Sequence, residues 1–106
     1  MAQTFDSVIV TDIGSTDKTL FTTPSQKTIL VGCNFANKTT YELPISLWVR
    51  RGAINGFIVK DYRVASGQNT DIIKGKLVLD AGDTLMARCP LDSAFDAHVS
   101  LLTGVD

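Results

Sequence analysis

The segment from Tyr41 to Arg50 carries the pattern that most constrains how this chain can fold. Its side chains alternate strictly, one set being Tyr41, Leu43, Ile45, Leu47 and Val49, and the other Glu42, Pro44, Ser46, Trp48 and Arg50. A period of two is typical of a β-strand with one buried face. Because proline lacks the amide N–H that a sheet ladder needs, Pro44 predicts a sheet edge or a bulge in this strand.

The amino-acid composition favours the same kind of structure for the rest of the chain. Ten aspartates but a single glutamate are present, together with eight glycines and twelve threonines. Helical surfaces favour Glu, whereas Asp and Gly are common in turns, and Thr is stiff at χ1 and suits a pleated strand. We therefore expect an all-β domain.

Turn residues divide the chain into short stretches of high β propensity. In one of them Ile29, Val31, Cys33 and Phe35 recur at period two, which predicts that these four side chains share a buried face. The expected strands are 7–13, 19–23, 28–35, 41–50, 57–64, 70–73, 76–79, 84–89 and 97–102, with Lys74–Gly75 forming either a hairpin turn or a kink. About eight short strands at this spacing predict a single antiparallel β-sandwich over residues 1–106, immunoglobulin-like or jelly-roll-like. Residues 1–18 form either an N-terminal arm or an edge strand.

The charge balance narrows the classes of partner. Ten Lys and Arg residues oppose eleven Asp and Glu residues, which leaves a formal net charge of −1. A nucleic-acid-binding protein normally has a strong basic excess, so we expect no nucleic-acid partner. No apolar run approaches the length of a membrane span, and the first residues lack the pattern of a signal peptide, so we expect synthesis in the cytoplasm and no membrane partner.

The residues that could carry catalysis are few. The single histidine, His98, lies two residues from both Asp96 and Ser100. A hydrolytic triad needs a base beside a strained, activated nucleophile, and no nucleophile elbow or glycine-rich oxyanion loop accompanies this row. We therefore expect a polar, solvent-facing row on a strand, no enzymatic activity and no cofactor.

Two cysteines and a group of aspartates could serve other chemistry. Cys33 and Cys89 are far apart in the chain and lack the paired spacing of a zinc site, which favours two buried thiols, with a disulfide between them as the alternative. The C-terminal third is rich in acid, with Asp80, Asp83, Asp92, Asp96 and Asp106. Their spacing matches no calcium-binding loop and favours turn formation over metal binding, although a bound cation remains an alternative.

The candidate interface residues are one aromatic and four basic side chains. Trp48, Arg50, Arg51, Lys60 and Arg63 lie on or beside one predicted hairpin. Trp and Arg are the residues most enriched in interface hot spots. The alternatives are that Trp48 belongs to a covered sandwich face and that the basic residues protect a solvated sheet edge.

Three segments resemble small β-sandwich virion proteins of tailed bacteriophages. Residues 21–37 (FTTPSQKTILVGCNFAN) resemble an opening with a proline turn and a lysine-threonine step into a strand that ends near Cys-Asn. Residues 76–85 (KLVLDAGDTL) resemble the leucine-x-x-Gly-Asp turn of that group, and residues 96–102 (DAHVSLL) resemble its final strand. The chain departs from the group at Lys38–Tyr41, where a longer Gly/Ala-rich loop is usual, and at Arg50–Arg51.

This resemblance implies a structural role in a virion, without turnover. The expected protein is an oligomeric capsid cement or decoration protein, with a trimer as the favoured oligomer. Its expected partner is the major capsid protein. The first alternative is a neck, head–tail joining or tail accessory protein, with neck or tail proteins as partners. If Arg50 and Arg51 make the contact, reversing both charges should abolish association with the particle and leave the monomer folded.

A second class of function is a carbohydrate- or receptor-binding β module. The aromatic side chains Tyr41, Trp48, Phe57 and Tyr62 fall on neighbouring predicted strands and could stack on sugar rings. A third class is a small enzyme dependent on His98. Absence of binding on a glycan array would argue against the second class, and undiminished function of a His98→Ala variant against the third.

Overall fold

The protein folds into nine strands that pack as two antiparallel sheets, which confirms the predicted all-β sandwich. A computed structural model describes residues 4–73 and 76–105, and Lys74–Gly75 and Asp106 lie outside the described residues. The strands are β1 (Thr4–Ile13), β2 (Lys18–Thr22), β3 (Lys27–Asn37), β4 (Leu43–Arg51), β5 (Ile54–Val64), β6 (Asn69–Asp71), β7 (Leu77–Leu79), β8 (Thr84–Arg88) and β9 (Phe95–Val105). The described part of the chain contains no helix that could cross a membrane.

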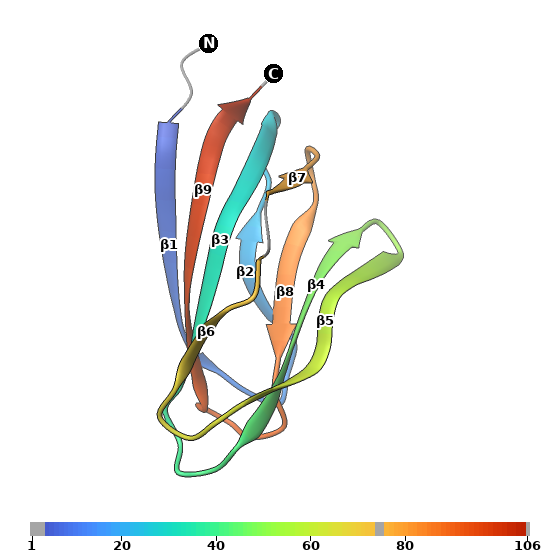
Figure 1. The fold of residues 1–106 in the computed structure, drawn as a ribbon. Coiled ribbons are helices and arrows are strands. Elements are labelled where there is room, and N and C mark those ends of the chain that lie inside the picture. The colour runs from blue at the N-terminus through green and yellow to red at the C-terminus, as the bar shows by residue number, and fades with distance from the viewer. Residues whose placement is uncertain (1–3, 74–75, 106) are drawn as a thin grey trace.

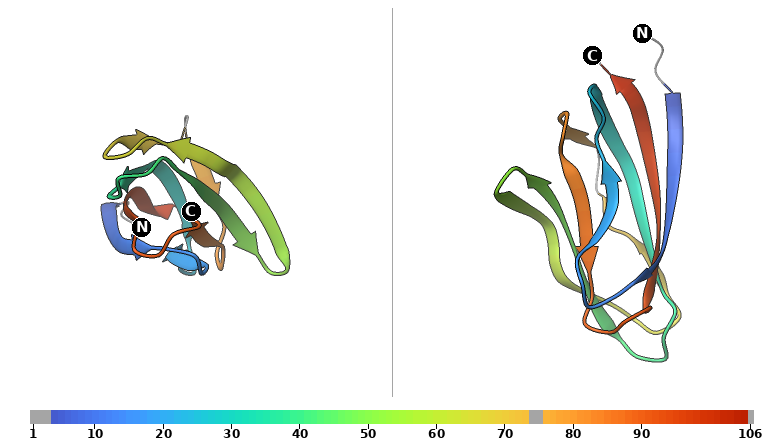
Figure 2. Two further views of the ribbon diagram at one scale, coloured as in Figure 1. Left: turned by 90° about the horizontal axis from the view of Figure 1, so that it is seen from below. Right: turned by 180° about the vertical axis from the view of Figure 1, so that it is seen from behind.

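The order of the strands identifies which kind of sandwich this is. One sheet has the order β1-β9-β3-β6, with β7 also paired to β3, and the other has the order β2-β8-β4-β5 (Figures 1 and 2). Consecutive strands such as β1, β2 and β3 alternate between the sheets. In an immunoglobulin-like domain the first two strands share a sheet, so this order is that of a jelly roll.

The core lies between the two sheets and consists of aliphatic and aromatic side chains from both. Within it, Phe35 near the end of β3 and Phe95 at the start of β9 are completely buried, with ring centroids 6.5 Å apart and planes at 82°. An edge-to-face pair of this kind adds to the stabilisation that comes from buried area alone. These two rings therefore help to hold the end of β3 against the start of β9.

The predicted buried face of β3 is correct for one half of the strand and wrong for the other. Cys33 and Phe35 are fully buried as expected, but Leu30 and Thr28 point into the core in place of Val31 and Ile29. The pairing between β3 and β9 shifts register between Leu30 and Gly32. An extra residue in one strand reverses the alternation of side chains, which explains the change of face.

Two further details of the β4–β5 region bear on the sequence interpretation. Of the edge or bulge predicted from Pro44, the edge is wrong, because β4 lies between β8 and β5, but the pairing of β4 with β5 is irregular between Ile45 and Leu47. The pairing of β4 with β8 covers only Ser46–Arg50. Pro44 precedes that span, so its missing N–H removes no bond to β8. The expected turn over residues 51–56 is shorter than predicted, since Gly52 at φ +59° and Ala53 alone connect the two strands.

Candidate functional site

Strand β5 is an open edge of the described structure. It ends its sheet, so one side of its eleven-residue backbone has no neighbouring strand. Asp61 adopts φ +54° and its N–H donates to the Ser46 hydroxyl at 3.0 Å, and the register between β4 and β5 shifts on both sides of Leu47. Bulges bend and twist a strand, and the β4–β5 hairpin leans away from the opposite sheet (Figure 1).

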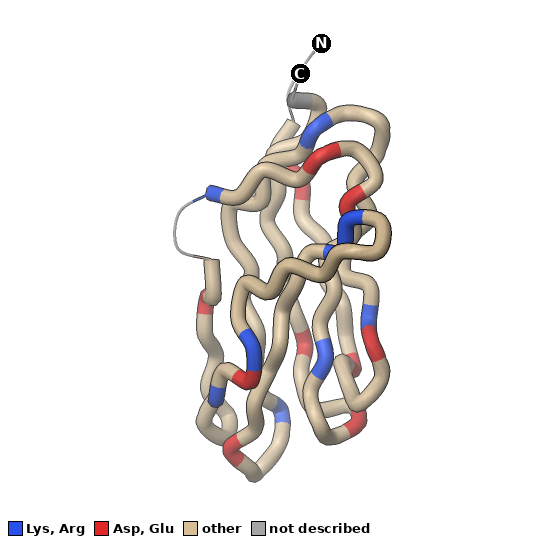
Figure 3. The backbone as a smooth tube through the Cα atoms, turned by 90° about the vertical axis from the view of Figure 1, so that its right-hand side faces the viewer, with Lys and Arg blue, Asp and Glu red and all other residues tan. Residues whose placement is uncertain are grey.

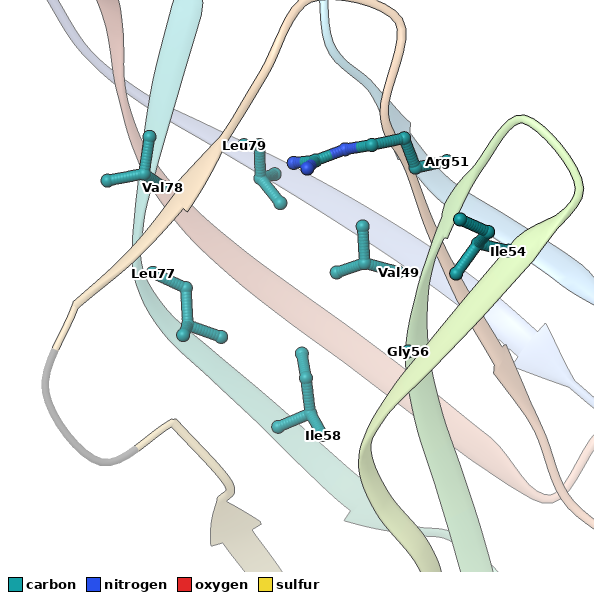
Figure 4. A pocket seen from close by; sticks show the side chains of 8 residues that line it. All are labelled: Val49, Arg51, Ile54, Gly56, Ile58, Leu77, Val78 and Leu79. Carbon is teal, nitrogen blue, oxygen red and sulfur yellow. The ribbon is translucent and has the colours of Figure 1, made fainter.

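The space that this divergence leaves is an apolar groove of about 300 Å³ between the hairpin and β7. Its walls are mainly aliphatic, and its lining residues are Val49, Arg51, Ile54, Gly56, Ile58, Leu77, Val78 and Leu79 (Figure 4). Ile58 and Leu77 also line a second hollow that continues along β5 past Tyr62, Ile72 and Ile73. The groove therefore follows the β5 edge of the sandwich.

Exposed apolar side chains concentrate beside this groove. Ile54 is 70% exposed, Val78 57% and Tyr62 46%. Single exposed apolar residues are normal on a protein surface, whereas a contiguous group indicates an interaction site. Sequence reasoning missed Ile54 because it assigned this residue to a turn, although its spacing of four from Ile58 fits one face of a strand.

Arg51 closes one end of the groove by an ion pair with a buried carboxylate. Its Nε and Nη2 atoms donate to Asp83 Oδ1 and Oδ2 at 2.8 and 2.7 Å, and Nη2 also lies 3.1 Å from Asp80 Oδ2. The Asp83 side chain is 1% exposed. The hydrogen bond from Arg51 lowers the pKa of Asp83 below its ordinary value. Arg51 thus fastens the hairpin to the β7–β8 turn, and reversing its charge would disturb the fold as well as a contact.

Trp48 lies on the outer face of its sheet but is covered by its own neighbours. It is 4% exposed and packs against Phe57 with ring centroids 5.3 Å apart. Lys60 Nζ lies 5.6 Å from the centroid of the same Phe57 ring. A partner would therefore meet Phe57 and Lys60 before Trp48, and Trp48 offers no free ring face for a sugar.

The remaining basic candidates differ in how they are paired. Arg50 contacts Asp17 at 3.4 Å and Asn55 at 3.1 Å. Lys60 and Arg63 are exposed, and among the described residues neither has an acidic partner within ion-pair distance. The first half of β5 is uncharged, and its charged residues gather in the second half (Figure 3).

The candidate catalytic row and the aspartate group are spread over the surface. His98 is exposed on the outer face of its sheet, and no hydrogen bond joins it to Asp96 or Ser100 within the described part of the chain. Asp96 instead contacts Lys38 at 3.0 Å. Asp92 accepts a hydrogen bond from Ser15, far from the Arg51 pair, and no three metal-ligating side chains come together among the residues that the structure describes.

Both cysteines are free and buried. Burial raises the pKa of the Cys33 thiol to about 12 and also raises the pKa of Cys89. Because the thiolate is the reactive species, we expect neither cysteine to react with Ellman's reagent in the folded protein at neutral pH. Both should react in denaturant. Rapid labelling of the native chain would contradict the buried placement, and no labelling in denaturant would indicate a disulfide.

No protein-family model matches the chain, and no curated protein matches it. Solved structures that are similar in fold include the following two. One, described as Bacillus endospore appendages that form a novel family of disulfide-linked pili, has a TM-score of 0.64 at 15% sequence identity and covers 98% of this chain and 89% of its own. The other, a pentameric capsid protein isolated from metagenomic phage sequences, has a TM-score of 0.50 at 19% identity and covers 90% of this chain. This chain spans 59% of that capsid protein.

Proposed function

We propose that this protein is a non-enzymatic structural subunit of a tailed-phage virion, with a capsid cement or decoration protein as the favoured position. The observation that carries the proposal is the β5 edge, eleven residues without a strand on one side and bordered by an apolar groove. Natural proteins usually blunt or cover such an edge, because it is a template for pairing with another chain. An uncovered edge is therefore suited to assembly.

The similar structures support a structural role of this kind. One is a pentameric phage capsid protein and the other a protein of pili, so each belongs to an assembly of many subunits. The phage protein also supports a location in a virion. Both similar proteins are subunits of larger assemblies. The segments of this sequence that resemble phage proteins favour a virion over a pilus as the assembly to which it belongs.

The net charge of the molecule is consistent with binding through many repeated weak contacts. With a net charge of −1, the protein would gain little from long-range attraction to a charged partner. Many weak, identical contacts on a symmetric shell add by avidity. A cement or decoration protein works in this way, and a neck, head–tail joining or tail accessory protein is the alternative for the same reasons.

The mass of the full chain by light scattering, at a low and a high concentration, tests whether it self-associates. We expect a trimer or another assembly at the higher concentration. A monomer at both concentrations would contradict self-assembly. Peptides of this chain in purified particles of the phage that encodes it would support the virion location, and their absence from complete particles would overturn it.

A further inference from the structure

The second large exposed apolar surface lies on β1, at the opposite side of the sandwich from β5. Strand β1 ends its own sheet, and its outward-facing side chains include Phe5, 78% exposed, and Ile9, 70% exposed. The alternate residues Val8 and Val10 pack against the core. The described part of the molecule thus has two apolar edges, one on each sheet and at opposite ends of the strand order.

These two edges match in spacing and in side-chain size. The β1 edge presents Phe5, Ser7 and Ile9 on one face, and the groove is lined by Ile54, Gly56 and Ile58 from one face of β5. In both edges two bulky residues four positions apart flank a small residue. At a rise of about 3.3 Å per residue, the bulky side chains in each edge are about 13 Å apart.

The edges also match in direction and in the face they present. Both β1 and β5 run away from the end of the molecule where β1 begins and β9 ends (Figure 1). The outer face of the β1 sheet and the inner face of the β5 sheet point the same way in a two-layer sandwich. Suppose that a second copy is moved sideways, without rotation, until its β1 lies beside β5 of the first copy. Its Phe5 and Ile9 then lie on the groove side of β5, beneath β7.

Charge favours contact between the two different edges over contact between two identical ones. Strand β1 contains no basic residue; its Asp6 has no ion-pair partner among the described residues, and its Asp12 is paired with Lys38 at 2.8 Å. Strand β5 contains Lys60 and Arg63 against the single acid Asp61. Two β1 edges would bring aspartates together, and two β5 edges would bring the basic residues together. Complementary charges give specificity and suppress the wrong pairing.

We infer that the groove beside β5 binds the β1 edge of a second copy of this chain, so that each subunit contacts the next through two different surfaces. This inference rests on the proposed self-assembly and names the surfaces that carry it. The added strand continues the sheet through backbone hydrogen bonds, and the side chains of Phe5 and Ile9 fill the groove. Such head-to-tail contacts form a ring when the rotation closes and a filament when it does not.

The test uses two variants of the full chain, Phe5→Asp and Ile54→Asp, each at a highly exposed position. Each places a charge in an apolar contact and should weaken self-association about a hundredfold, so that the mass falls to that of a monomer. Tyr41→Asp is the matched control, because Tyr41 is 63% exposed outside both edges and its replacement should leave assembly unchanged. Circular dichroism shows whether each variant is folded.

Mixing the two variants separates head-to-tail contact from any symmetric one. Phe5→Asp keeps an intact groove and Ile54→Asp keeps an intact β1, so the mixture should form dimers and nothing larger. The variant that carries both replacements has neither surface intact, so it should remain monomeric and should bind neither single variant. Monomers in the mixture, or variants that assemble like the wild type, would overturn the inference. A wild-type chain that stays monomeric would instead overturn the proposed self-assembly.

Discussion

Replacing Arg51 with alanine should lower the free energy of unfolding by on the order of 3 kcal/mol, because it removes the partner of a buried carboxylate. Asp83 is 1% exposed and depends on Arg51 for two hydrogen bonds. Its remaining donor is the Asp80 backbone N–H. In thermal unfolding the expected change is a fall in Tm of roughly 15 °C.

A matched control for this prediction is Arg50→Ala. Arg50 and Asp17 are both partly exposed and their contact is 3.4 Å long, so its loss should cost less than about 0.5 kcal/mol. Adding Asp83→Asn to the Arg51→Ala variant removes the unpaired buried charge and should recover part of the lost stability. Equal effects of the Arg50 and Arg51 replacements would contradict the buried ion pair.

The same pair makes a prediction about pH. The hydrogen bond from Arg51 lowers the pKa of Asp83 from its ordinary value of 3.8. A group whose pKa is lower in the folded chain contributes its full stabilisation above the unfolded value and loses it as the pH falls through the folded value. The wild type should therefore lose stability below about pH 4, and the Arg51→Ala variant should show a shallower dependence in urea titrations over this range.

Replacing Phe35 with alanine should be the most damaging single change in the core, with a loss of about 4 kcal/mol. The ring is completely buried and packs edge-to-face on Phe95, so its removal leaves a cavity and takes away the ring contact. A loss of this size approaches the whole stability of a small domain, and the chain should be largely unfolded at moderate temperature. Circular dichroism during urea titration measures the change.

Two further variants keep this prediction measurable. Phe35→Leu retains most of the volume and should cost about 1.5 kcal/mol. Phe57→Ala removes a ring that is half exposed and should cost about 1 kcal/mol. If the Phe57 replacement were as damaging as that of Phe35, the centre of stability would lie outside the two-sheet core.

Most of the strands could be predicted from the sequence because alternation is a local signal. Leu43 to Val49 follow it without interruption, and the core residues Ile45 and Leu47 are completely buried. The signal failed where one extra residue changes the phase, as at Val31, because a bulge depends on the pairing with β9 and leaves no mark in a single strand. The sequence also left the choice between jelly-roll and immunoglobulin-like strand order open, because strand order depends on long-range pairing.

The groove could not be predicted for a related reason. Ile54 and Ile58 belong to β5, whereas Leu77 and Val78 belong to β7 in the other sheet. Only the stacking of the two sheets brings these residues together, and the irregular pairing of β4 with β5 accompanies the space between them. The sequence showed the basic residues near this edge. It overestimated how accessible Trp48 is to a partner, because the burial of Trp48 by Phe57 depends on the register of β4 and β5.

The pairing of β1 with β9 also decides how the molecule responds to force. Thr4 lies opposite Thr103, so the first and last described strands begin and end side by side. A pull applied between these two residues breaks the backbone hydrogen bonds between β1 and β9 one after another, which is the weakest geometry for a pair of strands. Tension that instead acts across β1, at right angles to the strand, is shared by all of its hydrogen bonds to β9 at once.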